Sequence, residues 1–398
     1  MHGSETDQGI TIVGVPLDNM TMRSAIARIA GYLQEGGFHQ VATANINFLV
    51  NSLRHPELRK VLGSCDMVVP DGMPLLWISR QMRTPLRERV TGVDMVPHLA
   101  RLSAEHGYRI YLLGAIESSS NAAVAELERQ YPGVQIVGRH CPPYLPLDQM
   151  DNEDILRRIR AARPDILLVA FGNPKQEIWL ARHRNRLQVP VCMGIGGSLN
   201  MIAGIVPRSP EKYQRLGIEW IYRASREPGR LVGRYLADAF GLLLPLARQI
   251  FAFARQGERT PLFEGVPSQL PGASVFPLTG GLSGFDCSAL EEQIDRYRVG
   301  NAHVILDLAG LNFIDGIAVT RLIRLANRFH HTGSGLWLVN LRPAVLRILR
   351  GSRAGDPLHF ANSVRQAMER IAALSATAHY DGHTVLSGLH AKASYQTI

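Results

Sequence analysis

The segment ILLVAFGNPKQEIWLARHRNRL (residues 166–187) carries the pattern that decides the fold. It begins with a short apolar run that is typical of a buried strand, and Gly172 then opens a turn. Pro174 suits the first turn of a helix, and the residues after it continue with a helical pattern. The segment therefore predicts a strand followed directly by a helix, which is the repeating unit of a parallel α/β sheet.

The same alternation extends over residues 9–207. Further strands are expected at 10–15, 40–44, 67–69, 109–113 and 191–195, and helices at 22–36, 51–63 and 118–131. This order predicts a Rossmann-like, mainly parallel sheet with helices on both faces. Ligands bind such sheets beyond the carboxyl ends of the strands, so the loops that begin there are where a site is expected.

A second module follows a linker at 257–272. Its pattern predicts a small α/β domain, with strands at 304–308 and 336–340 and helices near 316–331 and from Pro343. The chain then divides into an enzyme domain over 1–235, a basic helical connector and linker over 236–272, the small domain over 273–373, and a disordered tail over 374–398.

The chain of 398 residues is 46% hydrophobic, which is enough for real cores, and its formal charge is +9. Residues 208–259 hold ten basic and five acidic residues, so much of the excess lies there. The apolar stretch 236–256 is interrupted by Asp238 and Pro245, which predicts no transmembrane helix. It is interpreted either as an interfacial helix or as a helix that docks on a neighbouring domain. The four cysteines show no metal-ligand spacing, and no metal is expected.

Polar residues follow several predicted strands, in TANINF (43–48), PDGMP (70–74) and GIGGS (194–198). An Asp-Gly pair usually marks a turn, but Asp71 beside a pocket could act as a general base, because desolvation raises a carboxyl pKa. The helix after Pro174, with Lys175, and the GIGGS turn offer N–H groups to phosphates. Neither a GxGxxG motif nor a P-loop is present, and the absence of the first disfavours a dehydrogenase. There is also no DxD motif to hold a divalent ion, so arginines and backbone N–H groups would have to neutralise a leaving diphosphate.

In this order, the segments resemble the WecG/TagA/CpsF family of bacterial glycosyltransferases. The resemblance rests on TANINF (43–48), PDGMP (70–74), RVTGVD (89–94), YLLGA (111–115), GNPKQEIW (172–179), GIGGSLNMIAGIVPRSP (194–210) and EWIYRASREPGRLVGRY (219–235). It implies an inverting enzyme that moves a sugar, of the N-acetylmannosamine type or a related hexose, from a UDP-sugar to a polyprenyl-diphosphate-linked saccharide. The setting implied is surface or exopolysaccharide synthesis at the inner face of the plasma membrane, without a metal or other cofactor.

The resemblance also assigns residues. Asp71 would be the catalytic base, and Thr43 and Gln176 would orient sugar groups. The expected site thus has Asp71 and Thr43 as catalytic residues, and Asn45, Asn47, Gly72, Lys175, Gln176, Glu177, Gly196, Gly197, Ser198, Arg223, Arg226 and Arg230 as substrate-binding residues. The family commonly has aspartate where this chain has Asn200 and alanine at Ser209, and these departures bear on the donor more than on the reaction. The basic segment 208–259 would contact the membrane surface, and no nucleic-acid partner is expected.

The second module resembles a STAS domain through LDLAGLNFIDGIAVTRLIRLANRF (306–329) and GLWLVNL (335–341). STAS domains that are switched by phosphorylation carry a hydroxyl residue directly after the aspartate of the FID segment, whereas Gly316 follows Asp315 here. A docking or regulatory role with a protein partner is what remains, and the alternative is a structural appendage. For the whole chain the rival interpretation is a non-catalytic STAS-based regulator with a degenerate enzyme domain.

Overall fold

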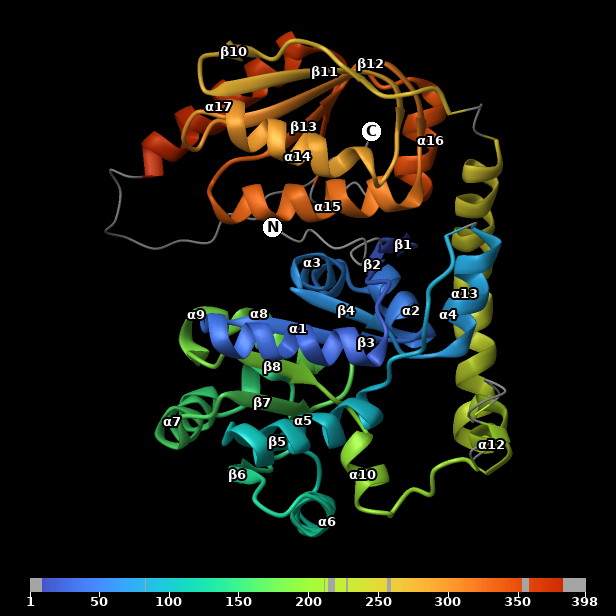
Figure 1. Cartoon of the computed structure of the whole chain (residues 1–398), viewed down its shortest axis with the longest axis vertical. Helices are drawn as coiled ribbons and strands as arrows, with labels where there is room; N and C mark the ends of the chain where they lie inside the picture. Colours follow the sequence, from blue (N-terminus) through green and yellow to red (C-terminus); the bar gives the residue numbers. More distant parts are fainter. Residues whose placement is uncertain are drawn as a thin grey trace.

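The computed structural model describes residues 9–82, 84–210, 212–213, 219–226, 228–255, 259–352 and 358–381. Figure 1 shows two α/β domains stacked along the long axis of the molecule, with one long helix running beside both. The predicted fold class is confirmed, because a parallel sheet flanked by helices is followed by a separate small α/β domain.

The first domain is built on a six-stranded sheet in which every pairing is parallel. Its strands, in the order β4-β3-β8-β7-β5-β6, are β4 (Met67–Pro70), β3 (His39–Ala44), β8 (Val191–Gly194), β7 (Ile166–Ala170), β5 (Arg109–Gly114) and β6 (Gln135–His140). Strand β6 escaped the sequence analysis because it is a half-exposed edge strand and has no continuous apolar run.

Helices cover both faces because alternate strand residues point to opposite sides. On one face lie α1 (Met22–Glu35), α5 (Gly92–His106), α6 (Glu117–Gln130) and α10 (Ser198–Ile202). The other face carries α2 (Ile46–Arg54), α3 (Pro56–Ser64), α4 (Met73–Gln81), α7 (Asn152–Ala162), α8 (Lys175–Arg182) and α9 (Arg184–Leu187). In β3, Val41 packs on the first set and Ala42 on the second.

Two sequence-based elements differ in the structure. The strand expected at 10–15 is a hairpin of β1 (Ile10–Ile12) and β2 (Val15–Leu17), because Val13 and Gly14 turn the chain with φ values of 48° and 87°. The helix expected at 51–63 is two helices, since α2 ends at Arg54 and Pro56 begins α3.

The second domain has β12 (His303–Ile314) at the centre of a mixed sheet. Strands β11 (Ala273–Leu282), β12, β13 (Leu336–Val339) and β14 (Leu358–Ala361) are parallel, while β9 (Phe263–Glu264) and β10 (Ser268–Leu270) run antiparallel to β11. One face packs on α14 (Asp286–Tyr297), α15 (Gly316–His331) and α16 (Pro343–Gly351), and the other on α17 (Val364–Asp381). Helix α17 passes the boundary predicted at 373, and the rest of the expected tail, 382–398, lies outside the described residues.

The two domains meet where α15 packs against β1, β2 and α3 (Figure 1). Hydrogen bonds cross this contact: the hydroxyls of Thr11 and Thr320 lie 2.8 Å apart, and Asn327 donates to the carbonyl of Gly63 at 2.6 Å. Arg324 forms an ion pair of 2.6 Å with the fully buried Asp18. The small domain is therefore packed onto the first one through buried polar contacts as well as apolar ones.

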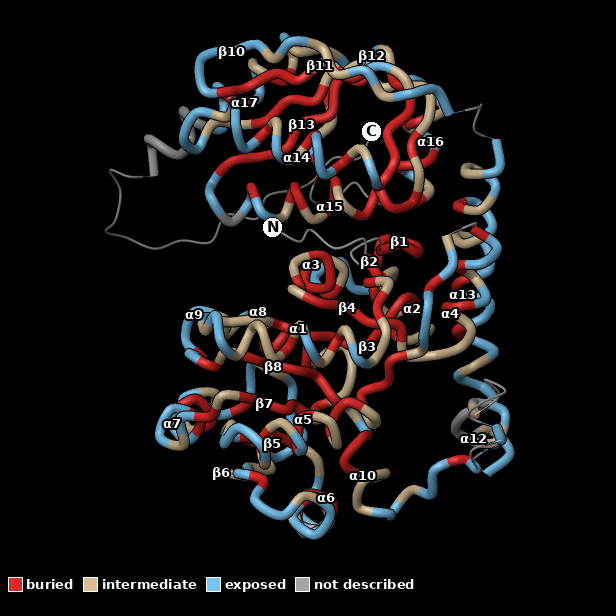
Figure 2. The backbone as a smooth tube through the Cα atoms, in the orientation of Figure 1, coloured by how far each residue is buried: buried red, intermediate tan, exposed pale blue. Residues whose placement is uncertain are grey.

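Helix α13 (Pro228–Ala254) runs along both domains, and it crosses the boundary predicted at 235. Figure 2 shows it mostly exposed, with single buried positions at intervals. By length and composition alone, Val232–Ala254 is apolar enough to cross a membrane, unlike the expectation from the sequence. Two of its polar residues are nevertheless buried in protein contacts, Asp238 against the first domain and Gln249 at the junction of the two. The structure therefore shows that this segment docks on both domains with one face, while its other face is exposed.

Candidate active site

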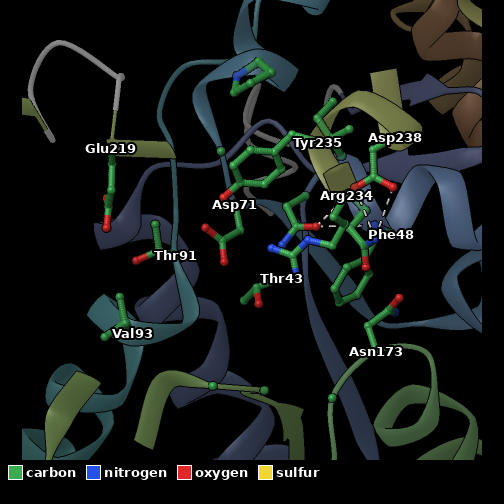
Figure 3. Close-up of a pocket in the computed structure, with 18 of the residues that line it drawn as sticks. Thr43, Phe48, Asp71, Thr91, Val93, Asn173, Glu219, Arg234, Tyr235 and Asp238 are labelled. Carbon is green, nitrogen blue, oxygen red and sulfur yellow. Dashed lines mark hydrogen bonds between the residues drawn. The ribbon is translucent and has the colours of Figure 1, made fainter. Parts of the chain in front are cut away.

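A cavity of about 970 Å³ opens at the carboxyl ends of β3, β4, β7 and β8. The loops after these strands supply one part of its wall, and the other part comes from Arg89, from Glu219 at the start of α12 (Glu219–Arg226) and from α13. Figure 3 shows side chains from these separate elements converging on the same space. The parallel sheet thus brings together loops that lie far apart in the sequence.

Asp71 lies directly after β4, and its side chain lines the cavity (Figure 3). Its backbone N–H donates to the carbonyl of Ala44 at 2.7 Å, which joins the ends of β4 and β3. Burial raises the pKa of Asp71 to about 7. The positive charge of Arg89 opposes this rise, the negative charge of Glu219 adds to it, and a hydrogen bond from the Gly92 N–H opposes it. A carboxyl with this pKa exchanges protons near neutral pH, which is what a general base requires.

Arg89 and Glu219 form a close ion pair, with 2.8 Å between a guanidinium nitrogen and a carboxylate oxygen. Both side chains are largely buried, at 18% and 14% exposed. The pair connects α12 to the loop that precedes α5. It therefore ties α12, within the basic segment 208–259, to the first domain and at the same time sets the electrostatic surroundings of Asp71.

Thr43 stands near the end of β3, next to the strand that leads to Asp71, and is only 6% exposed. Its hydroxyl faces the start of α5, because a Cβ added to Gly92 would lie 3.2 Å from Thr43 Oγ1. The same added Cβ would lie 3.4 Å from Ser198 Oγ. Glycine at position 92 thus allows two cavity-lining hydroxyls and the N-terminus of α5 to come close together.

The two asparagines of TANINF line the cavity, but each is already engaged with the protein. Asn45 is the N-cap of α2, where its Oδ1 accepts hydrogen bonds from the backbone N–H groups of Asn47 and Phe48 at 3.0 and 3.3 Å. The Asn47 Nδ2 donates to both carboxylate oxygens of Asp238, at 3.2 and 3.4 Å. These contacts position the loop after β3 and join it to α13.

Gln176 holds two strand-end loops together. Its Oε1 accepts hydrogen bonds from the N–H groups of Gly172 and Gly196, each at 3.0 Å, and its Nε2 donates to Glu177 Oε1 at 2.6 Å. At 2% exposure it reaches the cavity only with an edge of its side chain. The geometry therefore gives Gln176 a role in shaping the site, and the sugar contact that the resemblance implies stays a prediction.

Two other residues of the PKQE segment lie away from the cavity wall. Lys175 Nζ contacts the carbonyl of Leu145 and sits over the ring of Tyr144, 4.3 Å from its centroid. Glu177 is 1% exposed, and burial raises its pKa to about 7. Its carboxylate accepts hydrogen bonds from Asn173 and Gln176, so it belongs to the framework beneath the loop.

The GIGGS turn lines the cavity after β8 with Gly196, Gly197 and Ser198. Gly196 has a φ of +49°, a conformation that favours glycine, and its N–H is held by Gln176. A Cβ on Gly197 would meet nothing within 4 Å, so this position leaves open space on the cavity side. Gly72, after Asp71, also lines the cavity and has a φ of +151°.

The predicted arginines do not all reach the cavity. Arg226 is exposed and lies over the ring of Tyr222, whereas the side chains of Arg223 and Arg230 lie outside the described residues. Arg234, one turn further along, lines the cavity together with Tyr235. Sequence reasoning also left Arg89, Glu219, Asn173 and Asp238 out of the site. Of these, Arg89 begins RVTGVD, Asn173 lies in GNPKQEIW and Glu219 begins EWIYR, so three of the four lie in motifs of the family resemblance.

Within the described part of the chain, no three His, Cys, Asp or Glu side chains are grouped as ligands of a metal ion. Among the side chains that the structure describes, the cations that line the cavity are Arg89 and Arg234. An anionic group in the cavity would therefore meet guanidinium groups and the N–H groups of glycine-rich turns.

Comparison with known proteins adds to this geometry. Residues 10–256 match the model of the glycosyl transferase WecG/TagA/CpsF family, and residues 267–367 match that of the STAS domain. The chain is 30% identical over 217 residues to N-acetylglucosaminyldiphosphoundecaprenol N-acetyl-beta-D-mannosaminyltransferase of Staphylococcus aureus strains NCTC 8325 and COL. The match covers 54% of this chain and 84% of those enzymes. A solved structure of the murine anion transporter Slc26a9 matches 50% of this chain and 34% of its own, with 16% identity and a TM-score of 0.24.

Proposed function

Because the chain belongs to the WecG/TagA/CpsF glycosyltransferase family, we propose that it transfers a sugar from a UDP-sugar to a polyprenyl-diphosphate-linked saccharide, with inversion at the anomeric carbon. The observation that carries the proposal is Asp71, whose pKa of about 7 and place in the cavity suit a general base. The activity named for the Staphylococcus aureus relative supports a lipid-linked acceptor and an N-acetylmannosamine-type donor.

The proposed reaction is a single displacement. Asp71 accepts the proton of the acceptor hydroxyl as that oxygen attacks the anomeric carbon, and the bond from this carbon to UDP breaks at the same time. The electron pair leaves with the diphosphate, whose growing negative charge would be stabilised by Arg89, Arg234 and the N–H groups of the GIGGS turn. Thr43 would orient the sugar beside Asp71. On this scheme the chain needs no metal, and transfer should persist in EDTA.

The direct test is to incubate the purified full-length protein with a panel of UDP-sugars and an N-acetylglucosaminyl-diphosphate lipid, and to measure UDP release and product mass. We expect transfer from one donor, and we expect Asp71→Asn to abolish it while UDP still binds. Full activity of Asp71→Asn would remove Asp71 from the role of base. UDP binding without transfer from any donor would instead favour a non-catalytic, STAS-based scaffold protein.

We also propose that the exposed face of α13 lies on the inner surface of the plasma membrane, where a lipid-linked acceptor of surface or exopolysaccharide synthesis would be found. Large apolar side chains are exposed along it, at Val232, Leu236, Phe240, Leu243, Leu244 and Phe251. Arg248 and Arg255 are exposed on the same helix or just beyond its end. An apolar face edged by arginines suits an interfacial helix on anionic lipid.

Flotation with vesicles of anionic phospholipid tests this placement. The Phe240→Ser/Leu244→Ser variant is expected to lose most binding, because two large apolar side chains no longer enter the interface. A matched pair on the first domain, Ile116→Ser/Leu145→Ser, also removes exposed apolar side chains and should float like the wild type. Equal flotation of all three proteins would exclude this face of α13 as the membrane contact.

A further inference from the structure

We propose that Asp238 is a positioning residue that holds α13 over the cavity and so places Arg234 and Tyr235 in its wall. The inference rests on the transferase function proposed above only for its effect on turnover. The contact that it describes exists before any substrate binds.

Asp238 stands out because it is a buried carboxylate on a mostly exposed, apolar helix. It is 5% exposed, whereas its neighbours Ala237 and Ala239 are exposed and Phe240 is 73% exposed. Burying a charged group costs free energy unless hydrogen bonds replace its water. Both oxygens of Asp238 face the Asn47 Nδ2, at 3.2 and 3.4 Å, so the carboxylate is turned toward α2.

The contact continues through a chain of side-chain amides. Asn51 Nδ2 donates to Asn47 Oδ1 at 3.1 Å and to Asn173 Oδ1 at 2.7 Å. Asn173 Nδ2 then donates to Glu177 Oε2 at 2.9 Å. The chain therefore begins at a carboxylate on α13, crosses α2, and ends at a carboxylate beneath the loop after β7.

When both are ionised, the two carboxylates fix the orientation of every amide between them. An ionised carboxylate only accepts hydrogen bonds, so Asn47 and Asn173 must direct their NH₂ groups toward Asp238 and Glu177. Their oxygens then point inward, and the two hydrogens of the Asn51 amide satisfy both. With both carboxylates ionised, one arrangement of donors and acceptors meets all these contacts, and it is the arrangement that the structure has.

The far end of the network reaches the loops that line the cavity. Glu177 also accepts from Gln176, which holds the N–H groups of Gly172 and Gly196. The position of α13 and the shape of the strand-end loops are thus fixed by one connected set of bonds. Arg234 precedes Asp238 by four residues and so lies on the same side of the helix (Figure 3). When Asp238 is docked, Arg234 is directed into the cavity.

The variant Asp238→Leu removes the acceptor and keeps a side chain of similar size. We expect kcat/KM for transfer to fall by about 10- to 100-fold, because a displacement of about 1 Å at a catalytic site costs on this order. Asp238→Asn keeps one oxygen acceptor for Asn47 and should restore most of the activity. Ala237→Leu places the same leucine one residue earlier on the exposed side, and it should behave like the wild type.

Hydrogen exchange measured without substrate separates this inference from the proposed function. In Asp238→Leu the amides of residues 232–246 should exchange faster, while those of 248–254 stay protected because Gln249 still bonds to Val13 and Thr11. This result can be obtained even if the wild type shows no transfer. Equal exchange over 232–246 in the wild type and Asp238→Leu would overturn the proposal.

A double-mutant cycle with Asn47→Leu tests the partner. If Asp238 acts through Asn47, the double variant should lose no more activity and no more protection than Asn47→Leu alone, which also removes the acceptor of Asn51. Additive losses would overturn the proposal, because Asp238 would then act through another group. If Asp238→Leu fails to fold, Asn47→Leu breaks the same contact from α2 and should loosen the same amides.

Discussion

The ion pair beside Asp71 predicts that two substitutions move the pH dependence of transfer in opposite directions. Burial raises the pKa of Asp71 to about 7, Arg89 lowers it and Glu219 raises it. The base form of Asp71 is needed, so kcat/KM for the acceptor should rise with pH along a limb centred near pH 7. Arg89→Met should shift this limb to higher pH, and Glu219→Gln should shift it to lower pH.

The expected size of each shift is about one pH unit. Two unit charges about 6 Å apart interact by about 2.8 kcal/mol at an effective dielectric constant of 20, which corresponds to about two pKa units. Both side chains are partly exposed, at 18% and 14%, so solvent screens their charges and we expect about half of this shift. At pH 6.5 the fraction of Asp71 in its base form would then fall about eightfold in Arg89→Met and rise about threefold in Glu219→Gln.

The assay is the initial rate of UDP release at low acceptor concentration between pH 5.5 and 9. Arg89→Met also lowers the maximum rate if the guanidinium stabilises the leaving diphosphate, but the midpoint of the limb does not depend on that loss. Glu219→Gln is therefore the sharper of the two tests. If both variants keep the wild-type midpoint, or if both shift it in the same direction, the assignment of the limb to Asp71 is refuted.

Three further predictions concern stability, measured by urea unfolding. Because folding raises the pKa of Asp71 from 3.8 to about 7, the fold favours its protonated form, and this contribution is lost as the pH rises from about 4 to about 7. Asp71→Asn should thus raise the free energy of unfolding by about 2–4 kcal/mol at pH 8 and leave it unchanged at pH 4; a loss of stability at pH 8 would contradict the raised pKa. Gly194→Ala places a Cβ 2.4 Å from the Gln176 amide and should lower the free energy of unfolding by about 1–3 kcal/mol. In Gly197→Ala the added Cβ meets nothing within 4 Å, so this free energy should change by less than about 0.5 kcal/mol. Equal effects of the two variants would contradict the close packing at Gly194. Arg324→Met leaves the buried carboxylate of Asp18 without its cation and should cost about 3 kcal/mol, and a change below about 0.5 kcal/mol would show that the ion pair contributes little.

The strands and the loops after them could be predicted because a parallel sheet with helices on both faces has a recognisable sequence pattern. Strands buried on both faces are continuous apolar runs, and the polar residue after such a run, as with Asp71, falls at the ligand-binding edge. Strand β6 was missed because an edge strand with half-exposed residues lacks this pattern. The hairpin at β1 and β2 was missed because its turn depends on a positive φ at Val13, which residue type alone does not indicate.

The partners of the site residues could not be predicted, because they depend on contacts between distant segments. Arg89 and Glu219 are 130 residues apart in the chain, and Asn47 and Asp238 are 191 apart. Asp238 even counted as an interruption of an apolar run, since nothing local shows that an asparagine on α2 satisfies it. Gln176 was identified as a site residue, but only the structure shows that its side-chain oxygen accepts hydrogen bonds from the N–H groups of Gly172 and Gly196 in two loops.

The arrangement of α13 argues against treating the STAS-like domain as a separate appendage. One end of this helix places Arg234 and Asp238 at the cavity, and the other end places Gln249 where it donates to Thr11 of β1 and to Ser352 after α16. Both contacts belong to one helix, with Pro245 between them, so the STAS-like domain and the cavity wall pack against the same element. Removing residues 270–398 would also uncover the apolar residues of β1 that α15 now covers. The second domain is therefore packed against β1 and against the helix that lines the cavity, so it belongs to the structural surroundings of the candidate site.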